Sequence, residues 1–148
     1  MSIESVLDYA ILSRAAFDEL VEGNPQSWRE CVQAWRSEIN FADESNAKQW
    51  EKVQLFLDES HDLSICSIDF QENYLKVSFS TKEIIEFVAI KDIRIVPPNE
   101  ELPFALLYGE LRRIADCIFV HLLCDAIDIY IVCLHLNILT RQSTTIAL

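Results

Sequence analysis

The stretch Cys117–Leu139, CIFVHLLCDAIDIYIVCLHLNIL, is apolar over most of its length and decides the fold. β-Branched and aromatic residues crowd two short runs, Cys117–Cys124 and Ile129–Leu139, with the segment Asp125-Ala126-Ile127-Asp128 between them. This pattern predicts two antiparallel strands joined as a β-hairpin. Alternate side chains of a strand point to opposite faces, and both sets are apolar here. We therefore expect both faces of the hairpin to be covered, by helices, a second sheet or another chain.

A membrane-spanning segment is one alternative for Ile114–Leu139, and charge argues against it. Three aspartates lie inside the segment, and each carboxylate near the centre of a bilayer costs about 2.5–3.5 kcal/mol. A buried helix that continues from Leu106 through Leu123 is a second alternative, because short apolar runs do not distinguish helix from strand. We expect no membrane association, and residues 106–124 stay open between helix and strand.

The first part of the chain has helical periodicity. Apolar residues recur at helical spacing between Ser2 and Glu22, and Gly23 is suited to end that helix. Asn24 and Pro25 are suited to begin a second helix, over Pro25–Ile39. A third helix is expected between Asp43 and Glu59.

From Leu63 onward the periodicity becomes that of strands. A short helix over Pro103–Ile114, with Gly109 as its weak point, is expected to lead into the hairpin. The predicted fold class is α+β in a single domain, residues 1–148. A three-helix layer (1–60) packs on a mostly antiparallel five- or six-stranded sheet (61–148) that ends in the buried β-hairpin. The strands expected before the hairpin are Leu63–Phe70, Tyr74–Ser80, Ile84–Ile90 and Ile93–Val96, the last two forming one interrupted strand or two short ones.

The chain is strongly acidic, with 24 acidic and 12 basic residues and a net charge of -12. Such a charge repels phosphate backbones and disfavours direct nucleic-acid binding, whereas it attracts a basic protein; the plainer interpretation is solubility. Residues 1–62 hold 13 acidic and five basic residues, net -8, so an acidic recognition surface is expected on the helices. Trp28 and Trp35 are expected in the core or, alternatively, as anchors for the partner. The candidate partner-binding residues are Asp18, Glu19, Glu22, Trp28, Glu30, Trp35, Glu38, Asp43, Glu44 and Glu51.

The numbers of cysteines and glycines limit the kinds of site that this chain can form. Five cysteines are an odd number, and four of them lie in apolar runs, which indicates free thiols in a reducing cytoplasm. The start of the chain lacks the basic region of a signal peptide. Only two glycines are present, so the sequence contains no glycine-rich phosphate-binding loop. We therefore expect no cofactor.

One face of the hairpin is the best candidate for chemistry. His121, Cys133 and His135 are weak candidate metal ligands, because imidazole and thiolate are ligands that zinc prefers. Cys117 lies roughly 13 Å from His121 along a strand, too far to complete the same site. The alternative is that the histidines are buried and hydrogen-bonded.

The expected function is non-catalytic binding, in which an acidic face masks a basic protein partner. An immunity protein or antitoxin-like inhibitor of a nuclease toxin is the concrete form. A small hydrolase or ligand-binding enzyme that uses His121 or His135 is the alternative, and a scaffold or regulatory subunit is the third. Homodimerisation through the two-sided apolar hairpin is also expected.

Overall fold

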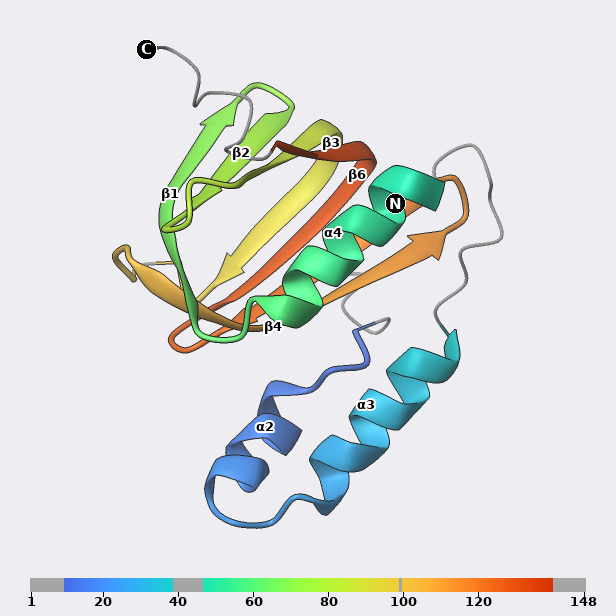
Figure 1. Cartoon of the computed structure of the whole chain (residues 1–148), viewed down its shortest axis with the longest axis vertical. Helices are drawn as coiled ribbons and strands as arrows, with labels where there is room; N and C mark the ends of the chain where they lie inside the picture. The colour runs from blue at the N-terminus through green and yellow to red at the C-terminus, as the bar shows by residue number, and fades with distance from the viewer. Residues whose placement is uncertain (1–9, 39–46, 99, 140–148) are drawn as a thin grey trace.

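The computed structural model describes residues 10–38, 47–98 and 100–139 (Figure 1). Within these residues, three helices precede six antiparallel strands, so the predicted α+β class is confirmed. The helices are α2 (Arg14–Val21), α3 (Gln26–Glu38) and α4 (Ala47–Glu59), and the strands are β1 (Leu63–Gln71), β2 (Tyr74–Phe79), β3 (Ile84–Val96), β4 (Phe104–Ile114), β5 (Cys117–Cys124) and β6 (Asp128–Leu139).

The sheet closes on itself. The strand order is β1-β2-β3-β6-β5-β4, and β1 also pairs with β4, which makes a closed barrel. One side of each strand contributes to a single large core cluster, which includes Leu75, Phe87 and Leu122. Val53 and Leu57 of α4 belong to the same cluster, so this helix completes the barrel core.

The interruption predicted at Lys91-Asp92 is a β-bulge in one continuous strand. β3 pairs with β6 along its whole length, and the register shifts between Ile90 and Asp92. An extra residue in one strand disrupts the ladder locally and bends the strand without ending it. β3 can therefore follow the curve of the barrel.

The prediction of a helix over Pro103–Ile114 is wrong, because this segment forms strand β4. Its leucine, glutamate and arginine residues favour helix intrinsically, but the segment pairs with β1 on one edge and with β5 on the other. These long-range hydrogen bonds and the burial of Phe104 and Leu111 in the core override the local preference. The sequence left residues 106–124 open between helix and strand; in the structure they form strands β4 and β5, with a turn at Ala115 and Asp116 between them.

The first helix is shorter than predicted. It begins after Ser13, whose side chain caps the N–H of Ala16, and residues 10–13 are not helical. The predicted part before residue 10 lies outside the described residues. α2 and α3 bury Leu12, Ala16, Trp28 and Trp35 between them, and these two helices lie to one side of the barrel (Figure 1).

The α2–α3 unit, residues 10–38, contacts the barrel through Tyr108 of β4. The Tyr108 ring lies 4.7 Å from the Trp28 ring and 6.0 Å from the Phe17 ring, measured between centroids. Within the described part of the chain, no helix is both long enough and apolar enough to cross a membrane.

Candidate functional site

A row of polar side chains crosses the outer face of the barrel. Glu110 on β4 pairs with His121 on β5, His121 pairs with Tyr130 on β6, and Tyr130 pairs with Arg94 on β3. Paired residues of adjacent strands project from the same face of a sheet. The neighbouring residues of β5, Val120 and Leu122, project into the barrel core instead.

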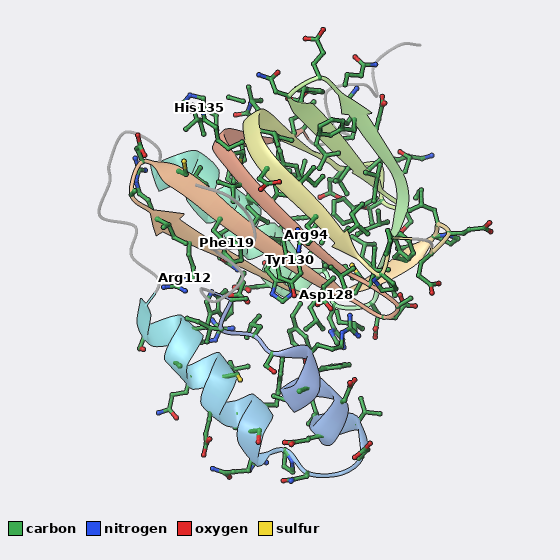
Figure 2. The ribbon with its side chains drawn as sticks, turned by 180° about the vertical axis from the view of Figure 1, so that it is seen from behind. Arg94, Arg112, Phe119, Asp128, Tyr130 and His135 are labelled. Carbon is green, nitrogen blue, oxygen red and sulfur yellow. The ribbon has the colours of Figure 1, made fainter. Side chains whose placement is uncertain are left out.

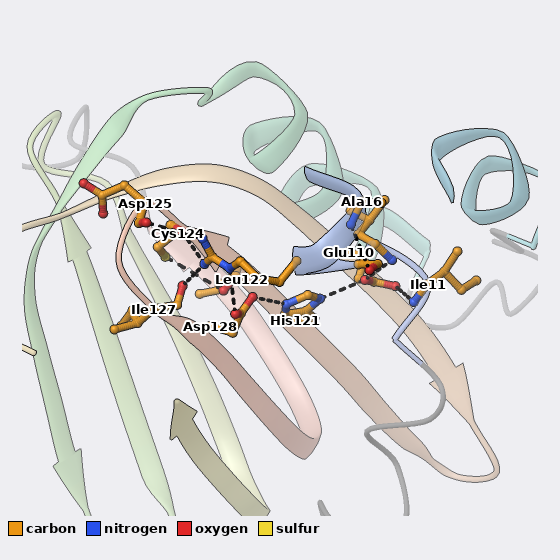
Figure 3. Close-up of polar contacts among 12 residues, drawn as sticks. Ile11, Ala16, Glu110, His121, Leu122, Cys124, Asp125, Ile127 and Asp128 are labelled. Carbon is orange, nitrogen blue, oxygen red and sulfur yellow. Dashed lines mark hydrogen bonds and ion pairs between the residues drawn. The ribbon is translucent and has the colours of Figure 1, made fainter. Parts of the chain in front are cut away.

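His121 lies between two carboxylates and is 1% exposed (Figure 3). Its Nδ1 is 2.9 Å from Glu110 Oε2, and its Nε2 is 2.8 Å from Asp128 Oδ1. The Tyr130 ring stacks on the imidazole at 4.6 Å, with 10° between the ring planes. Because carboxylates accept hydrogen bonds at both ring nitrogens, the geometry fits the doubly protonated imidazolium.

The start of the α2–α3 unit covers this cluster. The backbone N–H groups of Ile11 and Leu12 donate to the two oxygens of Glu110, at 3.0 and 2.9 Å. Arg14 Nε donates to Asp128 Oδ2 at 3.0 Å. We call Arg14, Glu110, His121 and Asp128 the polar centre. Its two cations and two carboxylates balance in charge.

The pKa shifts agree with that charge assignment. Burial alone would lower the pKa of His121, but hydrogen bonds to Asp128 and Glu110 and their charges raise it above its ordinary value. Burial alone would raise the pKa of Asp128, but its hydrogen bonds and ion pairs with His121 and Arg14 lower it. Burial, together with the charges of Asp128 and Glu110, raises the pKa of Tyr130 to about 12. The pKa directions of His121 and Asp128 therefore both favour an ion pair between an imidazolium and a carboxylate.

This arrangement leaves His121 without a nitrogen for chemistry. A general base or a metal ligand needs an imidazole lone pair that can reach its target. Both nitrogens of His121 face carboxylates. The geometry therefore supports the interpretation of His121 as a buried, hydrogen-bonded histidine, not the alternative of a metal ligand.

The three weak metal candidates do not come together. Cys133 is fully buried in the barrel core, whereas His121 lies on the outer face. His135 is exposed and lies toward the opposite end of β6 from Asp128 and Tyr130 (Figure 2). Among the described residues, no group of three or more histidine, cysteine, aspartate or glutamate side chains could hold a metal ion.

The prediction that His121 and Cys133 share one face of the hairpin is wrong, and the hairpin turn explains why. Cys124 N donates to Ile127 O, and His121 pairs with Tyr130. Odd-numbered residues of β5 therefore oppose even-numbered residues of β6. Since opposite residues share a face, Cys133 lies on the other face from His121.

The predicted partner-binding residues separate into two groups. Asp18, Glu22 and Glu30 are exposed and Glu19 is half-buried. Trp28 and Trp35 are 6% and 3% exposed, so they pack inside the α2–α3 unit and present no anchor surface. This favours the core interpretation of both tryptophans. Asp43, Glu44 and the side chains of Glu38 and Glu51 lie outside the described residues.

Two of these glutamates line a groove between α2 and α3. Its volume is about 440 Å³. Glu30 accepts a hydrogen bond from Gln26 Nε2 at 2.9 Å, while Glu19 Oε2 is buried with no hydrogen-bond partner among the described residues. The other residues that line the groove are small or apolar for the most part: Ile11, Ser13, Ala15, Ala16, Ser27, Cys31 and Ala34.

The third histidine, His61, lies in a second recess of about 380 Å³ between the end of α4 and the β2–β3 turn. Its Nδ1 is 2.8 Å from the carbonyl oxygen of Leu107, and its Nε2 is 3.6 Å from Asp62. The nearby Ser60 hydroxyl donates to the carbonyl oxygen of Phe56.

Comparisons with known proteins add little. No protein-family model matches the sequence, and no curated protein matches it. Among solved structures, the chain is similar to an uncharacterized protein from Neisseria gonorrhoeae, with 20% sequence identity and a TM-score of 0.42. The similarity covers 53% of this chain and 90% of that chain. It carries no argument about fold or function.

Proposed function

We propose that the protein is a non-catalytic binding protein whose α2–α3 unit masks a basic protein partner. The observation that supports this proposal is the groove lined by Glu19 and Glu30. A buried carboxylate oxygen without a hydrogen-bond partner is costly, and a cationic group in the groove would provide one. An inhibitor of a basic toxin, in the manner of an immunity protein or antitoxin, is the form that we propose.

The groove suits a lysine or arginine side chain. Long basic side chains lay their methylene groups along apolar surface and keep the charged end near an acceptor. Ala15, Ala16 and Ala34 offer such a surface, and Glu19 and Glu30 offer carboxylates beside it. The net charge of -12 would steer a basic protein toward this unit over longer distances.

Two further expectations belong to this proposal. A cytoplasmic location is supported by the five free cysteines, three of which are buried in the barrel.

The structure gives less support to a homodimer than the sequence did, because every residue of β5 is buried within the single chain. β5 therefore needs no second copy to cover it.

The test compares the wild type with the double variant Glu19→Gln, Glu30→Gln in affinity capture from the native lysate. The matched control is Glu100→Gln, Glu101→Gln, which removes the same charge from exposed residues that do not line the groove. We expect the wild type and the control to retain the same basic protein at low salt, less of it at high salt, and the groove variant to lose it. Equal retention by both variants would contradict the groove, and capture of no basic protein would contradict the function.

A further inference from the structure

Polar contacts between the α2–α3 unit and the barrel converge on the polar centre. Ile11 and Leu12 donate their backbone N–H groups to Glu110 of β4, and Arg14 donates to Asp128 of β6. His121 lies between these two carboxylates and joins them (Figure 3). Glu110 and Asp128, which share one imidazolium, therefore hold the unit together with the carbonyls of Cys124, Asp125 and Ile127, to which Arg14 also donates.

Loss of the His121 proton would break this arrangement. A neutral imidazole has one N–H, so its other nitrogen would present a lone pair to a carboxylate. The cluster would then hold two carboxylates against Arg14 alone, and Glu110 is completely buried. An uncompensated buried charge is strongly destabilising, and water relieves it. Water can reach Glu110 when the backbone of Ile11 and Leu12 moves away from it.

We propose that the polar centre is a pH-operated latch: the protonated His121 holds the α2–α3 unit against the barrel, and loss of that proton releases the unit while the barrel stays folded. Among the described residues, the groups that face His121 are Glu110 from β4, Asp128 and the Tyr130 ring from β6, with Arg14 behind Asp128. Arg94 of β3 lies in register beyond Tyr130. This device goes beyond the proposed function and does not depend on it.

The direction of the pH effect follows from the two shifted groups. The pKa of His121 is raised in the folded protein, so its contribution is complete below the ordinary value of 6.5 and is lost as the pH rises through the raised value. The pKa of Asp128 is lowered, so its contribution is complete above 3.8 and is lost only as the pH falls through the lower value. The α2–α3 unit is therefore expected to be released as the pH rises through the pKa of His121.

The test follows the wild-type protein by NMR with ¹³C-labelled histidine and methyl groups. The histidine signals give the titration midpoint of His121, and the Leu12 methyl groups and the NOEs between the Trp28 and Tyr108 rings report docking of the unit. We expect the docking signals to change with the midpoint of His121, while the methyl signals of Ile85 and Leu122 in the barrel keep their positions. Docking signals that do not change with the titration of His121 would contradict the latch. Loss of the barrel signals at the same pH would contradict it as well.

Two variants sharpen the result. His135→Gln removes an exposed histidine from the same strand as Asp128, and it should leave the docking midpoint unchanged. His121→Gln cannot supply a charge, and it should give the released signals of the α2–α3 unit at neutral pH with the barrel signals intact. If the barrel does not fold in His121→Gln, the wild-type titration decides by itself.

Discussion

Arg14 is the residue that joins the α2–α3 unit to the β5–β6 turn. Its guanidinium donates to the side chain of Asp128 and also to the backbone carbonyls of Cys124, Asp125 and Ile127. The carbonyl of Ile127 also accepts from Cys124 N within the hairpin. Arg14 adds donors from outside the turn, because a planar guanidinium can donate in several directions at once.

Replacing Arg14 with lysine keeps the charge and removes this geometry. A single ammonium group cannot span Asp128 and three carbonyls, so we expect the free energy of unfolding to fall by about 1–3 kcal/mol. Urea-induced unfolding of Arg14→Lys measures the loss. Arg29→Lys, at an exposed position on α3, is the control and should change the free energy little. Equal stability of the two variants would mean that the charge of Arg14 alone matters.

Secondary structure elements were predictable where their pattern is local. The alternation in Tyr74–Phe79 and the turn before it define β2, and the break at Lys91-Asp92 is visible as a bulge. β4 was not predictable, because its strand state depends on pairing with β1 and β5 on both edges. Local propensity carries no information about such long-range partners.

The polar centre could not be predicted from the sequence either, because its residues are long-range partners that local patterns do not reveal. Arg14 and Asp128 are 114 positions apart, and Ile11 and Glu110 are 99 apart. Asp128 was assigned to a turn, and Glu110 to a helix over Pro103–Ile114 where the structure has strand β4. A single carboxylate inside the apolar stretch FALLYGEL was the available signal, since a charged residue in a buried strand needs a partner.

Packing of α4 against β4 depends on a glycine. A Cβ atom added at Gly109 would lie 2.8 Å from Leu57 Cδ1 and 3.2 Å from Leu57 Cβ. Leu57 is part of the barrel core and 2% exposed, so it has little room to move. Gly109→Ala should therefore lower the free energy of unfolding by about 1–3 kcal/mol through overpacking.

A double-mutant cycle tests that explanation. Leu57→Ala removes the side chain that the new methyl group would meet, so Gly109→Ala should cost clearly less in the Leu57→Ala background than in the wild type. Thermal or urea unfolding of the four proteins gives the coupling free energy. If the two substitutions add independently, the contact between Leu57 and Gly109 is not the reason for the glycine.

The whole molecule carries a net charge of -12, from 24 acidic and 12 basic residues. Charges of one sign repel one another more strongly in the compact state than in the extended chain. Salt shortens the range of this repulsion, from about 8 Å at 0.15 M to about 3 Å at 1 M. The buried polar centre is screened much less, so salt weakens the repulsion while leaving the latch contacts in place.

The melting temperature should accordingly rise when sodium chloride is added at neutral pH. Thermal unfolding followed by circular dichroism over a range of salt concentrations measures the slope. The double variant Glu100→Gln, Glu101→Gln removes two exposed charges and should start from a higher melting temperature with a shallower slope, because less repulsion remains to be screened. A melting temperature that falls with salt in the wild type would show that attractive ion pairs at the surface outweigh the net repulsion.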